Sequence, residues 1–244
     1  MVEPTVSVVI PVHEQTSEQQ SAIDSVKNQT REPYEIIVSL DGVDGDKLDL
    51  NGCKVVKHSK GSPAGSRNEG VKKATGEYIA FLDSDDVWFK EKLETQMQKP
   101  YADVILCDCC ANNRYYSLNY TPIKQQLLHR LVTGTLMKTT PGLVIRRSLL
   151  FDIGLYDEDM RRNEDHLLLY RALSQNASHQ IIRKALWKNR GKGITNNTRG
   201  YDIIKYNLLM LRKTRHFRVK TVIELVLRTF PYAIYTDLKR MLRR

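Results

Sequence analysis

The chain has 244 residues, 41% of them hydrophobic and 27% charged, with a formal net charge of +10. These values exclude disordered, low-complexity and collagen-like proteins, and they leave room for a substantial core in one large domain or two closely packed ones. No uninterrupted apolar segment is long enough to span a membrane, and the start, MVEPTVSVVIPVHEQ, lacks the basic region of a secretory signal. We therefore expect a cytoplasmic protein, with peripheral contact at the inner face of a membrane as one alternative.

The first hundred residues alternate between strand-like and helix-like segments. Apolar or β-branched runs predict strands at 6–12, 34–40, 53–58 and 77–82. Helical spacing predicts one helix capped by Ser17 and another that follows a glycine-rich loop and stops at Gly76. This βαββαβ order, with continuously apolar strands, predicts an α/β fold in which a mostly parallel sheet is flanked by helices on both faces.

The second half is more mixed. We expect a strand at 102–107, a strand and short helix within 142–154, and a helix from Glu164 to Leu173. From Tyr201 the pattern is helical almost to the end. Cys107, Cys109 and Cys110 form a C-x-C-C run that matches no standard zinc spacing, so we expect free thiols at the end of a buried strand.

Polar residues follow three of the predicted strands. They are His13-Glu14, Asp41 and the segment Asp83-Ser84-Asp85-Asp86. In open parallel sheets, ligands bind beyond the carboxyl ends of the strands. A sheet that gathers acids at this edge is arranged for a cation, a sugar, or both.

Asp83 and Asp85 have two interpretations. Carboxylates one residue apart point the same way in extended chain, and a hard divalent cation would neutralise them. The alternative is an acidic turn in which an Asp caps a helix in VWFKEKLETQM. The position at a strand end favours the cation.

Two further segments carry charged groups with a chemical use. GSRNEGVKK half resembles a phosphate-binding P-loop, but Val71 stands where the lysine must be, so that interpretation fails. Its Arg67 could still lie near phosphates. In NEDHLLLYRAL, Asn163 is a plausible cap, and the first helical turn favours the ionised form of Asp165, which could then accept a proton from a hydroxyl.

Several segments in the same order resemble the family 2 glycosyltransferases, which have the GT-A fold. They are SVVIPVHEQ, SVKNQT, EIIVSLDG, GSRNEGVKKATGEYIAFLDSDD, GLVIRRSLL with GLYDED, NEDHLLLYRAL and WKNRGKGIT. Each is weak alone, but the ordered set is specific and covers most of residues 6–195.

The resemblance implies roles for particular residues. The donor nucleotide sugar would be bound by Pro11, His13, Glu14, Asp41, Arg67, Asp83, Ser84, Asp85, Asp86 and Arg190. Asp85, with Asp83, would hold a divalent metal, Mn²⁺ or Mg²⁺, in a D-x-D motif. Asp165 matches the acid of the family's "ED" motif, its general base. Arg190 falls where many members carry histidine, and it could meet phosphate.

The resemblance also implies an activity and a division of the chain. The expected enzyme is an inverting, metal-dependent transferase that moves a sugar from a nucleotide-diphosphate sugar, with UDP-sugars favoured, to a glycan, lipid-linked or envelope acceptor. Residues 1–100 would be the donor half of the GT-A domain, 101–198 the acceptor-binding and catalytic half, and 199–244 a basic helical tail. The alternatives are a catalytically silent relative that binds glycan or membrane, and a nucleotidyltransferase.

The tail is strongly basic. From Arg212 onward ten cations face two acids, which places +8 of the net +10 charge there. One hypothesis is an amphipathic helix on an anionic membrane through residues 212–244; the other is a helical pair packed on the domain with a solvated cationic face. No nucleic-acid partner is expected, because aromatic interleaving and any recognised module are missing.

Overall fold

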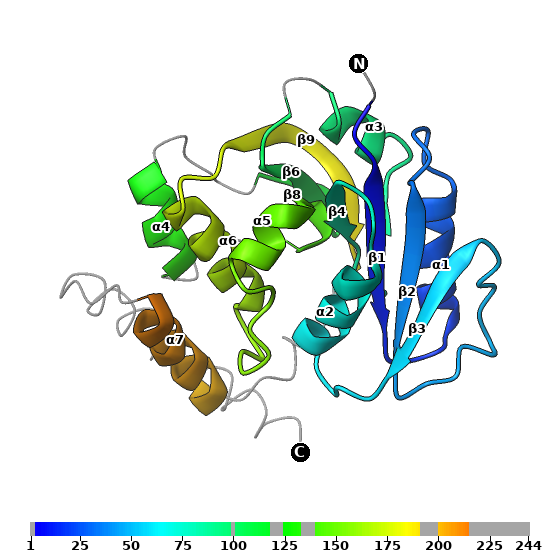
Figure 1. Cartoon of the computed structure of the whole chain (residues 1–244), viewed down its shortest axis with the longest axis horizontal. Helices are drawn as coiled ribbons and strands as arrows, with labels where there is room; N and C mark the ends of the chain where they lie inside the picture. Colours follow the sequence, from blue (N-terminus) through cyan, green and yellow to red (C-terminus); the bar gives the residue numbers. More distant parts are fainter. Residues whose placement is uncertain (1–2, 99–100, 118–123, 133–139, 191–199, 215–244) are drawn as a thin grey trace.

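A computed structural model describes residues 3–98, 101–117, 124–132, 140–190 and 200–214 (Figure 1). The strands are β1 (Val6–Val12), β2 (Glu35–Asp41), β3 (Cys53–His58), β4 (Tyr78–Phe81), β5 (Val87–Trp88), β6 (Val104–Ala111), β7 (Arg114–Tyr116), β8 (Val144–Arg146) and β9 (His179–Asn189). The helices are α1 (Ser17–Lys27), α2 (Pro63–Lys73), α3 (Lys92–Gln96), α4 (Lys124–Val132), α5 (Arg147–Asp152), α6 (Glu164–Ser174) and α7 (Gly200–Thr214), with a 3₁₀ turn at Thr140–Gly142.

One curled sheet runs through the molecule in the order β3-β2-β1-β4-β8-β6-β9-β5, and β7 pairs with the last residues of β6, Cys109 to Ala111. The first four strands in this order are mutually parallel, so the expected arrangement of the first half is confirmed. Beyond β4 the sheet is mixed, because β8 runs antiparallel to both β4 and β6 while β6 and β9 are parallel. Because β8 is antiparallel to both of these neighbours, β6 runs in the same direction as β4.

Each face of the sheet has its own apolar core. On one face the inward side chains of β1, β2 and β4 pack against α1 and α3; on the other face the alternate side chains pack against α2, α4, α5 and α6 (Figure 1). This two-sided burial explains why every residue of β1 is buried and why the strand reads as a continuous apolar run.

The position of α2 on the sheet depends on a glycine. A Cβ atom at Gly70 would lie 2.4 Å from Cγ1 of Val9 on β1, a separation that real contacts do not reach. Any larger residue would push α2 away from the strand. Gly70 therefore sets how closely the helix that carries Arg67 approaches the sheet.

Three local expectations were wrong. The N-cap of α1 is Thr16 rather than Ser17, because Thr16 has Gln19 three residues on and forms a capping box with it. Helix α2 ends at Lys73, three residues before Gly76. The segment after Asp86 is not a continuous helix capped by an Asp: Val87 and Trp88 pair with β9 as β5, and α3 begins only at Lys92. The long-range pairing with β9 outweighs the local helical pattern there.

The beginning of the basic tail packs on the domain. In α7, the side chains of Tyr206, Met210 and Leu211 are buried against residues of α4, α6 and the segment before α6. Lys213 Nζ also lies 2.7 Å from Asp157 Oδ2. The rest of the tail, 215–244, lies outside the described residues, so the membrane hypothesis stays a prediction, as does the division of the chain at residues 100 and 198.

Membrane-spanning helices were searched for in the described ranges, and none of the helices there combines the length and apolarity needed to cross a bilayer.

A fully buried lysine lies between α3 and the sheet. The Lys92 ammonium lies 3.8 Å from the centre of the Trp88 ring and donates a hydrogen bond to the side-chain oxygen of Gln96. Burial lowers the pKa of Lys92 from 10.5 to about 8, and it raises the pKa of the neighbouring Cys107 thiol to about 12. Cys107 is a free, buried thiol of β6, as the sequence predicts.

The buried lysine should make stability depend on pH. Because the pKa of Lys92 is depressed in the folded state, the unfolded chain binds more protons between pH 8 and 10, and stability must rise with pH there. We expect the free energy of unfolding of the natural chain to gain about 2 kcal/mol relative to Lys92→Met between these pH values, from denaturant titrations at each pH. The exposed neighbour substitution Lys90→Met should show no such trend; a flat difference for Lys92→Met would contradict the buried charge.

Candidate active site

The aspartates after β4 lie close together. The backbone N–H of Asp86 donates to the carbonyl oxygen of Asp83 at 3.0 Å, and this tight turn brings one carboxylate oxygen each of Asp83, Asp85 and Asp86 within 4.8 Å of one another. Asp83 and Asp86 are buried, and Asp85 is half-buried. Three carboxylate oxygens at this spacing fit the oxygen-rich coordination that Mg²⁺ and Mn²⁺ prefer.

Arg67 connects this cluster to a distant part of the chain. Its Nη2 lies 2.6 Å from Asp83 Oδ1, and its Nη1 lies 3.1 Å from Glu164 Oε1 on α6. The Arg67 side chain is 4% exposed. A guanidinium can bind two acids at once because its donors form a rigid planar fork. One side chain of α2 therefore joins the end of β4 to the start of α6.

The environment of Arg67 favours its charge. Burial opposes the charged form, but Asp83, Tyr156 and Glu164 outweigh this and raise the pKa of Arg67. The guanidinium also lies 5.2 Å from the centre of the Tyr156 ring, which packs edge-on against Phe81 of β4. Burial raises the pKa of the Glu164 carboxyl, an effect larger than the opposing attraction of Arg67.

Asp165 follows Glu164 in the first turn of α6. It is 7% exposed, and its Oδ1 accepts the backbone N–H of His166 at 2.9 Å. Asn163 stands at the predicted N-cap position, but its backbone is left-handed and its side chain instead donates to Asn207 of α7 at 2.8 Å. Arg67 therefore links the turn that carries the predicted metal-binding motif to the start of the helix that carries the predicted general base.

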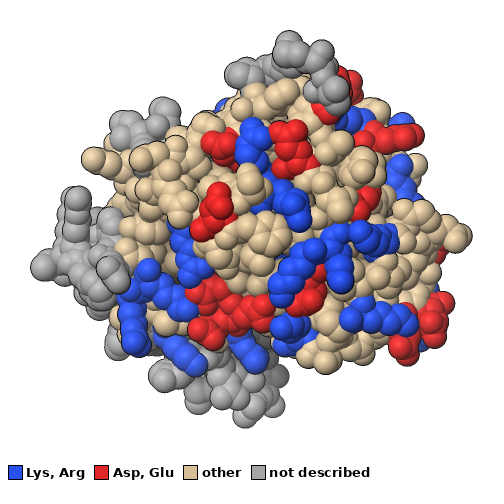
Figure 2. All heavy atoms as spheres, viewed as in Figure 1, with Lys and Arg blue, Asp and Glu red and all other residues tan. Residues whose placement is uncertain are grey.

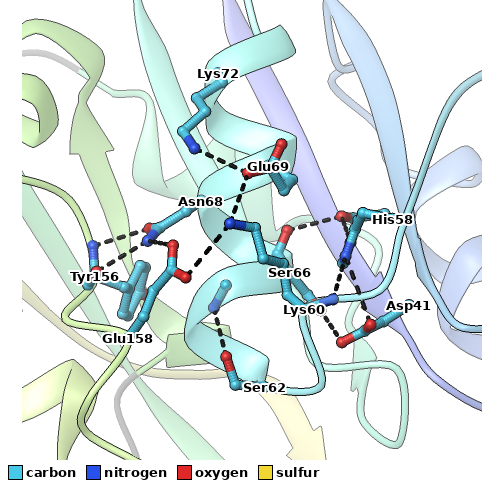
Figure 3. Close-up of polar contacts among 12 residues, drawn as sticks. Asp41, His58, Lys60, Ser62, Ser66, Asn68, Glu69, Lys72, Tyr156 and Glu158 are labelled. Carbon is cyan, nitrogen blue, oxygen red and sulfur yellow. Dashed lines mark hydrogen bonds and ion pairs between the residues drawn. The ribbon is translucent and has the colours of Figure 1, made fainter.

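Asp41 belongs to a neighbouring network at the same edge of the sheet (Figure 3). Its carboxylate accepts hydrogen bonds from Gly61 N–H at 3.0 Å and from the Ser66 hydroxyl at 2.9 Å, and it lies 3.6 Å from Nδ1 of His58. Ser66 and Arg67 are adjacent on α2, so consecutive residues of this helix reach the ends of β2 and β4. Each carboxylate oxygen of Asp41 has a second lone pair that a ligand could use.

A second set of contacts joins α2 to the segment before α6 (Figure 3). Asn68 donates to the Tyr156 carbonyl at 2.9 Å and accepts the Tyr156 N–H at 3.0 Å, as a neighbouring strand would. The Lys60 ammonium nitrogen lies 3.7 Å from Oε1 of Glu69 and 3.7 Å from Oε2 of Glu158. Figure 2 shows basic and acidic side chains side by side over this part of the surface. The two halves of the sheet are thus held together by α2.

The remaining predicted site residues lie at or near the same edge. Pro11 is buried within β1, while His13 and Glu14 follow it with exposed side chains. Ser84 is buried in the turn of the aspartates. The backbone N–H of Arg190, just beyond β9, donates to Asp86 Oδ1 at 3.1 Å. None of the contacts described here joins His13 or Glu14 to the aspartates.

Sequence reasoning missed three residues of this arrangement: Glu164 as a partner of Arg67, Tyr156 beneath the guanidinium, and Asn68 as a link between the halves. Glu164 carried a signal, since it sits beside Asp165. Tyr156 and Asn68 carried none, because 88 residues separate them along the chain.

Comparisons with known proteins agree on one class. The model of the family "Glycosyl transferase family 2" matches residues 7–153. An uncharacterized glycosyltransferase of Rickettsia conorii is 33% identical over 226 residues, covering 86% of this chain and 36% of that protein. A UDP-Glc:alpha-D-GlcNAc-diphosphoundecaprenol beta-1,3-glucosyltransferase of Escherichia coli is 36% identical over 104 residues, covering 38% of this chain and 39% of that protein.

Solved structures show the same fold. S. aureus TarS 1-349 is 21% identical and covers 94% of this chain and 72% of its own, with a TM-score of 0.68. The same protein in complex with UDP-GlcNAc is 22% identical and covers 86% of this chain and 66% of its own, with a TM-score of 0.66. The chain spans about a third of the length of the Rickettsia conorii relative.

The Arg67 contacts should be worth several kcal/mol. Arg67→Met leaves the buried Asp83 and the half-buried Glu164 without their cation, so we expect a loss of about 3–5 kcal/mol in the free energy of unfolding at pH 7, measured with denaturant. The loss of stability caused by Arg67→Met should become smaller toward pH 5, because protonation of the Asp83 and Glu164 carboxyls in the variant removes their uncompensated negative charge. Lys72→Met breaks the exposed ion pair with Glu69 on the same helix and should cost less than about 1 kcal/mol. Equal effects of the two substitutions would contradict the role of Arg67.

Proposed function

Because the chain belongs to glycosyl transferase family 2, we propose that it transfers a sugar from a nucleotide-diphosphate sugar to a hydroxyl group of a glycan, lipid-linked or envelope acceptor, with inversion at the anomeric carbon. The observation that carries the proposal is Arg67. One buried guanidinium holds Asp83, in a carboxylate cluster suited to a divalent cation, against Glu164, the neighbour of a buried Asp165.

The donor would lie along the carboxyl ends of β1, β2 and β4. Asp41 would accept a hydrogen bond from the base, with Pro11 and His13 against it, while Asp83 and Ser84 would meet the ribose. A UDP-sugar is favoured, because TarS has been solved with UDP and with UDP-GlcNAc and the Escherichia coli relative is named for UDP-Glc. The name of that relative also supports a lipid-linked acceptor.

A metal fits the carboxylate cluster. Asp85 would be its main ligand, with Asp83 contributing, while Asp86 is already oriented by the N–H of Arg190. Mn²⁺ or Mg²⁺ bound there would neutralise charge on the departing nucleoside diphosphate. Arg67 donates a hydrogen bond to one carboxylate oxygen of Asp83. In this proposal Arg67 therefore positions Asp83 rather than binding phosphate.

Asp165 would act as the general base. It lies in the first turn of α6 and is 7% exposed. It would take the proton of the acceptor hydroxyl as that oxygen attacks the anomeric carbon, while the bond from the sugar to the diphosphate breaks on the opposite side. Burial around Asp165 and Glu164 would limit the access of water to the reaction.

Donor binding tests the metal site. Native-state binding of UDP-GlcNAc, UDP-glucose or another nucleotide sugar should raise the melting temperature with Mn²⁺ or Mg²⁺ and not with EDTA. Asp85→Ala should abolish this shift. Asp44→Ala, which removes an exposed acid after β2, should leave it intact. No shift with any donor, from folded protein, would favour the alternative of a catalytically silent relative.

Turnover tests the base. Asp165→Asn should lower the release of UDP from UDP-GlcNAc, with water as the acceptor, by about 10²–10⁴-fold while the donor-induced thermal shift remains. Asp159→Asn, an exposed acid before α6, should leave the rate unchanged. Release of pyrophosphate instead of UDP would identify a nucleotidyltransferase, and an unchanged rate in Asp165→Asn would remove Asp165 from the mechanism.

A further inference from the structure

The β6–β7 hairpin presents an aromatic side chain with an unusual combination of exposure and constraint. Tyr115 on β7 is 56% exposed, yet its hydroxyl donates a hydrogen bond to Asp108 of β6, which is fully buried. An exposed tyrosine normally has a mobile ring, whereas a hydrogen bond to a buried partner fixes both its position and its direction. The ring is therefore a rigid apolar surface that faces solvent.

The partner of Tyr115 is itself held in place. Arg183 of β9 lies with Nη1 3.6 Å from Asp108 Oδ1 and donates to the Ser117 hydroxyl at 3.0 Å. The pairing of β6 with β9 is irregular on both sides of Asp108, and such irregularities redirect side chains. The Arg183 side chain is 45% exposed, so a polar guanidinium lies at the surface near the Tyr115 ring.

The hairpin lies at the edge of the sheet where the aspartates lie. β6 runs in the same direction as β4, so its carboxyl end, and the hairpin that follows, are at the edge where Asp83, Asp85 and Asp86 follow β4.

A row of paired residues leads from the hairpin to the aspartates. Tyr115 pairs with Cys110, Cys110 with Lys188, and Lys188 with Val87, which directly follows Asp86. Neighbouring strands are about 4.8 Å apart, so three steps place Tyr115 about 14 Å from Val87 along the sheet. Cys110, Lys188 and Val87 are all half-buried, so the surface between the two ends is not filled by core packing.

The same face of the sheet carries the predicted base. Val104 and Leu106 of β6 belong to the core that packs on α6, whereas Cys107 and Cys109 belong to the opposite core. Asp108 continues the alternation of Val104 and Leu106, so the ring bound to it lies on the α6 side. Asp165 is in the first turn of α6, so the ring and the proposed base flank the same surface.

We propose that Tyr115, with Arg183 beside it, forms a second subsite for the acceptor, in which a pyranose ring of an oligosaccharide stacks on Tyr115 and its hydroxyl groups accept hydrogen bonds from Arg183. The subsite rests on the proposed function. The distance from Tyr115 to the aspartates is longer than one sugar ring can span. The acceptor in this proposal is therefore an oligosaccharide whose reacting end lies at Asp165. The fixed ring lowers the entropy cost of binding, because no rotamer has to be selected.

The test is ¹⁹F NMR of the full chain labelled with 3-fluorotyrosine and titrated with chitotetraose, cellotetraose and maltotetraose. The signals of Tyr115 and Tyr34 are assigned from Tyr115→Phe and Tyr34→Phe. Tyr34 is a matched control, because it is 60% exposed but precedes β2 at the opposite edge of the sheet. At least one oligosaccharide should shift the Tyr115 signal in a saturable way and leave the Tyr34 signal unchanged.

Variants give a second measurement. Tyr115→Ala should weaken the binding of that oligosaccharide at least tenfold. Tyr115→Phe, which keeps the ring but loses the hydrogen bond that fixes it, should weaken binding less than Tyr115→Ala does, and Tyr34→Ala should change it less than threefold. No shift at Tyr115 with any of the three sugars, or equal shifts at Tyr34, would overturn the subsite. A metal-dependent thermal shift with a nucleotide sugar, measured on the same protein, tells whether the proposed function survives that result or fails with it.

Discussion

The rest of the candidate site depends on one buried guanidinium. Arg67 is on α2, Asp83 follows β4 and Glu164 begins α6, and the three meet only because the fold brings these elements to one edge of the sheet. Burying three charged groups is costly unless each is paired, and a bidentate arginine pairs both acids at once. The contact also limits the freedom between the carboxylate cluster and Asp165, since Asp83 belongs to the cluster and Glu164 directly precedes Asp165.

Helix α2 is the element that makes this contact possible. The absence of a side chain at Gly70 lets it approach β1, its first turns reach the ends of β2 and β4 through Ser66 and Arg67, and Asn68 pairs with the backbone of Tyr156. Four residues within a five-residue stretch of α2 therefore connect the parallel half of the sheet to the mixed half. Glycosyl transfer needs its reacting groups in a fixed relation, and these contacts of α2 fix the turn after β4 relative to the start of α6.

Charged side chains in the interior differ from those of the C-terminal tail in their surroundings. The buried Arg67 is paired with Asp83 and Glu164, whereas the buried Lys92 contacts an amide and a ring, and burial lowers its pKa. The hairpin follows the same rule, because Asp108 is buried against Tyr115 and Arg183. Most of the excess positive charge of the chain lies instead beyond Arg212. The electrostatics of the candidate site therefore depend on local ion pairs rather than on the net charge of the protein.

The sequence by itself determined the α/β class, the order of the first strands and helices, and the family, because strand runs, helical spacing and ordered motifs are local patterns. It also indicated which acids end the strands, since those acids adjoin the apolar runs. Only the tertiary structure decided that β8 runs antiparallel to both of its neighbours, that Val87 and Trp88 pair with β9, and that Arg67 contacts Glu164 as well as Asp83. It likewise placed Tyr115 on the face of Asp165. These outcomes depend on contacts between residues tens of positions apart, whose energies come from burial and pairing that no local pattern records.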